Sequence, residues 1–180
     1  MDEFFFAFWP NLAATLVGVV LGVPIALWVN RIADGAAKNA ELSDKKKQLL
    51  NACNVIESVL KFNYARVVQY PEILRSRQIA WNLGLNTTTW HAVSVDFSSE
   101  LTPPELRSRM SHQFGNVATL LWLNEQFLSF SFGVNASMSN ASTVKDSLSL
   151  RLVELCDLLT AETDALLKMT TDLKASLEKK

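Results

Sequence analysis

Only a few side chains in this sequence have the types and spacing that chemistry requires. The chain contains two histidines, His91 and His112, and neither has a cysteine or a carboxylate at a spacing typical of a zinc site. It has no glycine-rich phosphate-binding loop and no nucleophile-elbow motif. The strongest candidate pair is Arg107 and His112, which lie five residues apart in the stretch RSRMSH. Three isolated carboxylates have a solvated helix face or an ion pair as their usual role: Glu125, Glu154 and Glu162. The sequence therefore predicts no metal site and no cofactor, and it favours a non-enzymatic protein.

A helix beginning near Thr102 must position Arg107 and His112. Thr102-Pro103-Pro104-Glu105 is typical of a helix start, with Thr as the N-cap, Pro in the first turn and Glu at the third helical position. Residues five apart on a helix differ in direction by about 140°, so these two side chains can meet only through their reach. The helix should end at Gly133. Its core-facing stripe is Leu106, Met110, Phe114, Val117, Leu121, Asn124 and Leu128.

Two further helices are predicted on either side of this one. The first starts near Asp44 and should end or bend at Pro71. Its apolar face is Leu49, Cys53, Ile56, Leu60, Tyr64 and Val67. The last helix carries about four heptads, interrupted by one charge: Leu148, Leu152, Leu155, Leu159, Glu162, Leu166, Met169, Leu173 and Leu177. That stripe is either an intrachain seam or an intersubunit coiled coil, and flanking apolar residues favour a bundle core with partial use at an interface.

Between these helices, the stretch from Pro71 to Asp96 is expected to contain two short elements. Gly84 is expected to stop a short segment that contains Ile79 and Trp81. The hydroxyls of residues 87–89 are expected to cap a short helix at residues 90–95. Alternating apolar residues there also fit a strand, but no partner strand is visible elsewhere, so the helix is favoured.

Residues 4–29 form an apolar segment that contains no charge and only two polar residues, Asn11 and Thr15. The 20 residues from Pro10 to Val29 would span about 30 Å as a helix, which matches the hydrocarbon thickness of a bilayer. Trp9 and Trp28 stand at the two ends, where indole rings prefer the headgroup level. The N-terminal Met-Asp-Glu lacks the basic residues of a cleaved signal peptide. We therefore expect a retained transmembrane helix.

Charge distribution predicts the orientation of this anchor. All 17 Lys and Arg residues follow the apolar segment, so the positive-inside rule places the C-terminal domain in the cytoplasm. The expected location is the inner membrane, with a single pass and the lipid bilayer as a partner. A net charge of −1 argues against nucleic acid as an obligate partner. In a reducing cytoplasm, Cys53 and Cys156 are expected to be core residues and not a disulfide or metal pair.

Small residues repeat every four positions within the apolar segment: Ala14, Gly18, Gly22 and Ala26. Such a stripe lets membrane helices approach closely, and it includes one GxxxG motif. We expect copies of the chain to associate through this face. Pro24 is expected to bend the helix. The segment contains no charged residue, so the polar pathway of a transporter is absent.

The chain resembles the small membrane-anchored, HEPN-like accessory proteins of bacterial antiphage defence, especially those encoded beside RNA-targeting CRISPR effectors. The resemblance covers the architecture of the full chain, while its motif match is confined to Arg107 and His112. The stretches WPNLAATLVGVVLGVPIALWVNR, TTTWHAV and LTPPELRSRM also look like those of many bacterial anchored proteins. The resemblance implies a ring-shaped pore that depolarises the cell on infection. In nucleases of the HEPN family, the Arg would hold phosphate and the His would act in acid–base cleavage of RNA. Here Ser108 follows the Arg, where active members commonly carry Asn, Asp or His.

Together these patterns predict an all-α protein with three parts. Residues 4–29 form a transmembrane helix, residues 30–47 a juxtamembrane connection that can continue the helix, and residues 48–180 a cytoplasmic antiparallel helical bundle. The leading hypothesis is an oligomerising membrane effector that acts by permeabilisation or pore formation, in antiviral defence. One alternative is a membrane-tethered ribonuclease that uses Arg107 and His112. The other is a scaffold that presents its bundle to a cytosolic protein or a nucleic-acid-guided partner.

Overall fold

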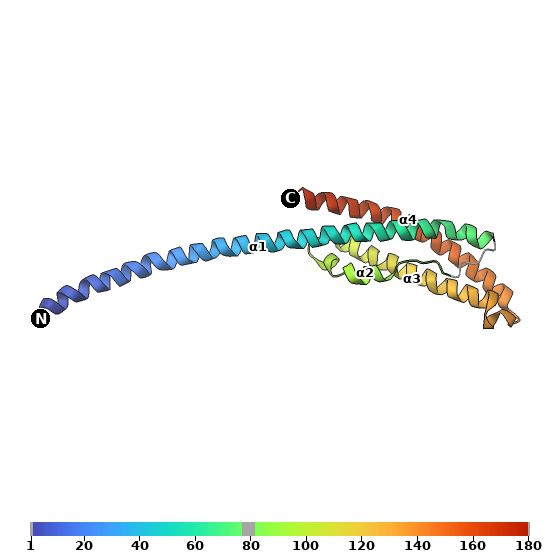
Figure 1. The fold of residues 1–180 in the computed structure, drawn as a ribbon, viewed down its shortest axis with the longest axis horizontal. Helices are drawn as coiled ribbons and strands as arrows, with labels where there is room; N and C mark the ends of the chain where they lie inside the picture. Colours follow the sequence, from blue (N-terminus) through green and yellow to red (C-terminus); the bar gives the residue numbers. More distant parts are fainter. Residues whose placement is uncertain (1, 77–81, 180) are drawn as a thin grey trace. The chain divides into compact units, whose positions relative to one another are not determined.

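The structure, a computed structural model, describes residues 2–76 and 82–179, without the side chains of residues 2–18, 20, 21 and 134. The described residues are mostly helical and contain no strand, which confirms the all-α prediction (Figure 1). Two short 3-10 turns, η1 (Asp96–Ser98) and η2 (Val134–Ser137), flank α3. Within the described ranges, the four α-helices are α1 (Asp2–Arg75), α2 (Thr88–Val93), α3 (Pro104–Phe132) and α4 (Ala141–Glu178).

The chain divides into two compact units, Met1–Asp44 and Lys45–Lys180. The described part of the first unit is helical and belongs to α1, which continues through Pro24 and through residues 30–47. Among the residues whose side chains are described, no helix has a stretch both long and apolar enough to cross a bilayer. Most of the uncharged segment 4–29 lies outside that set, because the side chains of residues 4–18, 20 and 21 are not described.

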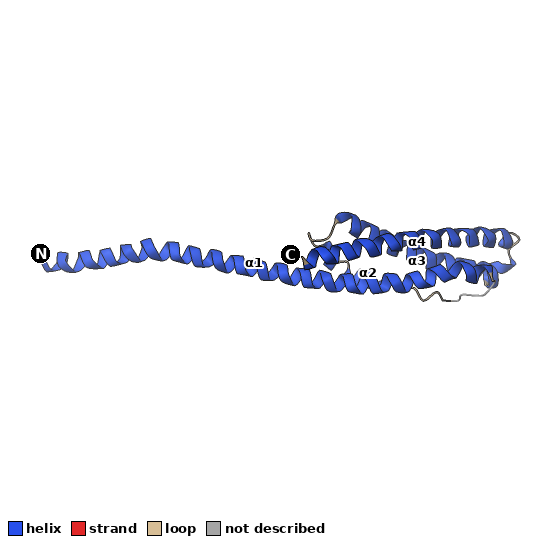
Figure 2. Ribbon diagram, turned by 90° about the horizontal axis from the view of Figure 1, so that it is seen from above, coloured by secondary structure: helices blue, strands red, loops and turns tan. Residues whose placement is uncertain are grey.

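In the second unit, the C-terminal part of α1 lies alongside α3 and α4, as Figures 1 and 2 both show. Hydrogen bonds fix the direction of the α3–α4 pair. Arg109 of α3 bonds to Glu162 of α4, and Gln113, one turn later on α3, bonds to Leu159, about one turn earlier on α4. The two helices are therefore antiparallel, with only a short turn between them.

Two groups of buried residues hold this unit together. The first joins residues 49–60 of α1 to the first half of α3, the last turns of α4 and the aromatic residues of the 88–98 segment. The second joins Val67 and Tyr70 of α1 to the middle of both α3 and α4. Trp90 explains the short helix α2, because its ring stacks on Phe114 at 5.7 Å between ring centroids and is 7% exposed. Burying an aromatic ring of this size stabilises a segment whose own helix propensity is weak.

The predicted apolar face of α1 agrees with the buried residues at five of its six positions. The exception is Tyr64, which is half-buried, whereas its neighbour Asn63 is only 4% exposed. The amide of Asn63 is satisfied by the backbone of Asn86, donating to its carbonyl at 2.9 Å and accepting from its N–H at 2.8 Å. A polar residue enters the core here because a loop supplies both of its partners.

Three predictions about helix ends are wrong in detail. α1 passes Pro71 and ends one turn later, at Arg75. The hydroxyl of Thr87 does not cap α2; instead the side-chain oxygen of Asn86 accepts from the N–H of Thr89 at 3.1 Å. The hydroxyl of Thr102 does not cap α3 either, because the N-cap is Pro103 and the Thr102 oxygen is buried without a hydrogen-bond partner in the described residues.

Two glycines behave differently from each other. Gly133 ends α3 as predicted. Gly84 lies in a loop and not at a helix end, and its φ of +58° explains why glycine stands there. The expected short segment around Ile79 and Trp81 lies outside the described residues.

Candidate functional site

Arg107 and His112, the pair with the strongest chemical signature, lie on the first three turns of α3. Arg107 is partly exposed and His112 is exposed. Neither side chain makes a hydrogen bond or an ion pair within the part of the chain that the structure describes. At five residues apart they point about 140° away from each other, so the described fold does not bring them into contact.

Arg109, between these two residues, makes the most developed polar contact of α3. Its guanidinium donates two parallel hydrogen bonds to the carboxylate of Glu162 on α4, at 2.7 and 2.8 Å. Glu105, one turn earlier on α3, adds an ion pair at 3.7 Å. The carboxylate of Glu162 raises the pKa of Arg109 above its usual value. A charged residue within the α4 heptad stripe requires such a partner, so the sequence signals an ion pair at Glu162 without identifying Arg109 as the residue that forms it.

A second ion-pair cluster joins α1 to α4. The carboxylate of Glu57 accepts from the ammonium groups of Lys61 at 2.6 Å and Lys174 at 2.9 Å. The hydrogen bonds from these two lysines lower the pKa of Glu57. The cluster therefore stabilises helix contacts, and its carboxylate is a poor proton acceptor at neutral pH.

Buried polar side chains connect the same helices. The amide of Gln113 donates to the hydroxyl of Thr163 at 2.6 Å and to the carbonyl of Leu159 at 3.1 Å. The hydroxyl of Tyr70 on α1 donates to the side-chain oxygen of Asn124 on α3, and burial raises the pKa of Tyr70. Each contact fixes how two helices pair, which is the usual role of buried polar groups that are satisfied.

Neither cysteine is a reactive thiol. Cys53 is fully buried and Cys156 is 1% exposed, as expected of core residues. Burial raises the pKa of Cys53 to about 11 and that of Cys156 to about 12. At neutral pH both groups therefore remain thiols, the form that neither attacks electrophiles nor binds metals.

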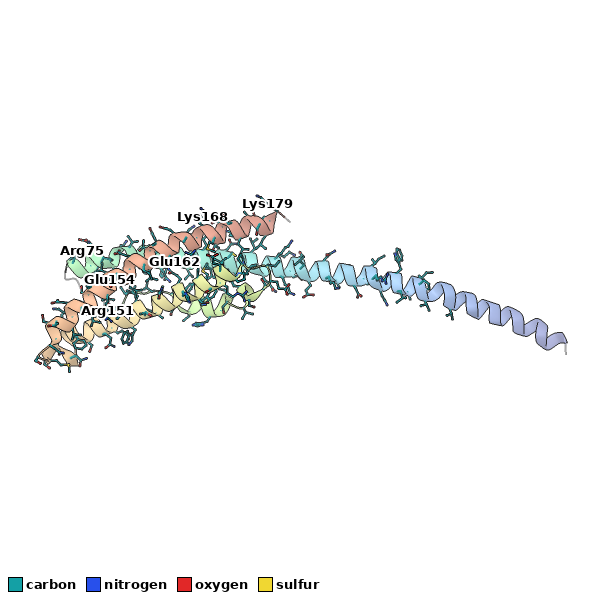
Figure 3. All side chains as sticks on the ribbon, turned by 180° about the vertical axis from the view of Figure 1, so that it is seen from behind. Arg75, Arg151, Glu154, Glu162, Lys168 and Lys179 are labelled. Atoms are coloured by element: carbon teal, nitrogen blue, oxygen red, sulfur yellow. The ribbon has the colours of Figure 1, made fainter. Side chains whose placement is uncertain are left out.

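The described clefts are open and shallow. One of about 220 Å³ lies between the start of the second unit and the 95–99 segment, where Lys45 and Asp96 line it. A larger one of about 390 Å³ is lined only by the first turns of α4, including Leu148 and Arg151. Figure 3 labels Arg151 with Glu154, Glu162 and Lys168, all on α4. Residues from one helix cannot surround a small molecule, unlike the walls of an enclosed ligand site.

The described residues also contain no group of His, Cys, Asp or Glu that could hold a metal ion.

Two of the four small residues expected to associate membrane helices, Gly22 and Ala26, lie among the residues whose exposure the structure describes. Gly22 and Ala26 are exposed in the described structure, and a side chain added at Gly22 would meet no atom within 4 Å. The side chains of Ala14 and the surroundings of Gly18 lie outside the described residues.

The α4 stripe has two kinds of positions. Leu152, Leu159 and Leu166 are buried, while Leu148, Leu155 and Glu162 are half-buried. In the second unit, Leu152, Leu159 and Leu166 are therefore part of the core within one chain.

Comparison with known proteins adds no identity. No protein-family model, no curated protein and no solved structure matches this chain. The resemblance to membrane-anchored HEPN-like proteins and the role in antiviral defence therefore stay predictions. The ion pairs and buried hydrogen bonds described above join the helices of the second unit to one another.

Proposed function

We propose that the chain is a membrane-anchored, self-associating helical protein that permeabilises the membrane and catalyses no reaction. The observation that carries this proposal is the charge pattern of the sequence. The 26 residues from 4 to 29 contain no charge, and every lysine and arginine follows them. A segment of that length and composition partitions into a bilayer, and the basic residues after it favour a cytoplasmic bundle.

Contacts in the second unit support the non-catalytic part of the proposal. Two close ion pairs, Arg109 with Glu162 and Glu57 with Lys174, are engaged in contacts between helices. Both thiols are buried and have raised pKa values. Such a unit is suited to holding a shape or binding another protein surface, and its clefts are too open to exclude water from a reaction.

Space around Gly22 supports self-association through the N-terminal segment. Nothing lies within 4 Å of a side chain built at this position, so the backbone is open to close approach by another helix. The proposal requires that this face brings copies together, because a single uncharged helix encloses no pore.

The proposal is tested by detergent extraction of the full chain, by the mass of the extracted complex and by dye leakage from vesicles. We expect the full chain to require detergent, to form a large complex by light scattering, and to release dye from vesicles. Gly18→Leu/Gly22→Leu should abolish the complex and the leakage. The matched control Val19→Leu/Val23→Leu, which enlarges neighbouring positions outside the small stripe, should retain both. A protein that stays in solution without detergent, or a detergent-solubilised monomer, would overturn the proposal.

The same material separates the two alternatives. If the chain cleaves RNA and His112→Ala abolishes the cleavage, the tethered ribonuclease replaces the pore. If the complex forms but neither leakage nor cleavage is observed, the scaffold is the better description.

A further inference from the structure

The outward face of α3 combines a large exposed aromatic ring with small neighbours. Trp122 is 56% exposed, an unusual position for the largest side chain. Ser111, Gly115 and Ala118 lie on the same side of the helix, at spacings that keep them within about 60° of Trp122, and all three are exposed. A side chain added at Gly115 would meet no atom within 4 Å. The face is therefore flat in its middle and carries one projecting ring.

Opposite charges stand at the two ends of this face. Arg107 and Glu125 are 18 residues apart, which is five turns of helix, so they lie along the same edge. Neither forms an ion pair with any other residue in the described ranges. The midpoint between them falls next to Gly115.

We propose that α3 docks against α3 of a second copy of this chain, in antiparallel orientation, with the two-fold axis at Gly115. A two-fold axis places a residue n positions before Gly115 opposite the residue n positions after it. Trp122 then lies over the partner's Ser108, seven positions on the other side. Arg107 lies opposite the partner's Glu125 with a mismatch of about 3 Å along the axis, which the arginine side chain can span.

The charges of Arg107 and Glu125 favour a second copy of this chain over other binding partners for this face of α3. A parallel pair of α3 helices would place each charge level with its own copy on the opposite edge, so neither Arg107 nor Glu125 would meet an opposite charge. An acidic partner or a nucleic acid would be repelled by Glu125, and a basic partner would be repelled by Arg107. A second antiparallel copy pairs both charges and also provides small residues beneath each Trp122. The small residues near the axis permit helix axes to approach to about 8 Å.

Cysteine cross-linking of the full chain tests this geometry. Two copies of Gly115→Cys meet at the two-fold axis, so mild oxidation should produce a disulfide-linked dimer. Two copies of Ser108→Cys lie about 21 Å apart in this arrangement, beyond disulfide reach, although Ser108 is equally exposed. The native cysteines do not interfere, because both are buried. Cross-linking of both variants would indicate a parallel pair or random collision, and cross-linking of neither would indicate no contact; each result overturns the proposal.

Charge reversal supplies a second test in the Gly115→Cys background. Arg107→Glu and Glu125→Arg should each lower the cross-linked fraction at least about fivefold, because every reversal disrupts two symmetric ion pairs. Combining the two reversals should restore it. If the double variant stays as low as the single ones while its helix content is unchanged, the pairing is refuted.

This contact is independent of the membrane segment proposed above. Cross-linking of Gly115→Cys should persist when Gly18→Leu/Gly22→Leu is added. Loss of the cross-link in that background would show that α3 does not bring copies together by itself, and would overturn the proposal without touching the anchor.

Discussion

Two threonines on α4 offer a sharp test of how this helix is buried. Thr163 and Thr170 lie seven residues apart and are 3% and 0% exposed. Each hydroxyl donates to the carbonyl four residues earlier, at 2.7 Å from Thr163 and 2.8 Å from Thr170. They differ in one respect, because only the Thr163 oxygen also accepts a hydrogen bond from Gln113, at 2.6 Å. Changing each to Val keeps the shape and removes the hydroxyl.

The expected magnitudes follow from what each change leaves behind. In Thr170→Val the carbonyl of Leu166 keeps its helical N–H partner, so no polar group is orphaned and stability should change by less than about 0.5 kcal/mol. In Thr163→Val the amide of Gln113 loses one of two bonds, and its own oxygen already has no partner within the described chain. A buried donor left short of a partner costs about 1–2 kcal/mol.

Urea unfolding of the full chain in non-ionic detergent, followed by far-ultraviolet circular dichroism, measures both variants. A lower midpoint at unchanged slope would report the loss in Thr163→Val. Adding Gln113→Leu to Thr163→Val should recover part of that loss, because the pair then leaves no unpaired donor. The reasoning fails if Thr170→Val is as destabilising as Thr163→Val.

Three further changes probe the bundle by the same measurement. Leu159→Ala should cost about 2–5 kcal/mol because Leu159 is 1% exposed, whereas the adjacent Leu158→Ala, at a position 52% exposed, should cost less than about 1 kcal/mol; equal losses would contradict the assigned face of α4. Arg109→Lys should cost about 1 kcal/mol, because an ammonium cannot make both parallel hydrogen bonds to one carboxylate. Because Lys61 and Lys174 lower the pKa of Glu57 in the folded state, its stabilising effect is present above pH 4.5 and is lost as the pH falls through the folded pKa. Glu57→Gln should therefore be less stable than the parent at pH 7 and equal to it near pH 2, and a constant difference across that range would refute the ion pair.

The faces of α1 and α3 were predictable because apolar side chains supply nearly all of their buried surface. Spacing alone identifies five of the six expected positions on α1, all except Tyr64. On α3 the expected stripe is buried except at Leu121 and Leu128, which are half-buried. The burial of Asn63 could not be predicted from spacing, because it depends on the backbone of Asn86, 23 residues away. The cap of α2 could not be predicted for a related reason. Its oxygen belongs to Asn86, whose backbone is held by the same hydrogen bonds to Asn63.

The candidate site was also predicted incompletely, because its residues depend on contacts between helices. A two-residue motif predicted a role for Arg107, whereas the guanidinium that forms an ion pair with α4 belongs to Arg109. A spacing within one helix cannot show which residue faces the next helix. The carboxylate of Glu162 decides that, and it is 53 residues further along the chain.

The α4 stripe shows why hydrophobic spacing alone assigns some residues to the core incorrectly. Three alternate positions in the middle of the stripe are displaced by one residue, since Cys156, Thr163 and Thr170 are buried where the stripe expected Leu155, Glu162 and Met169. A threonine can be buried on a helix at little cost when its hydroxyl donates to the carbonyl of its own preceding turn, as both threonines do. The resulting face is rotated away from Glu162, which then lies at the edge of the core with its carboxylate free to reach Arg109. The internal bonds of the threonines and the ion pair across α3 and α4 are thus consequences of one rotation, and the loss expected in Thr163→Val tests it, because the bond from Gln113 to Thr163 requires Thr163 to face α3.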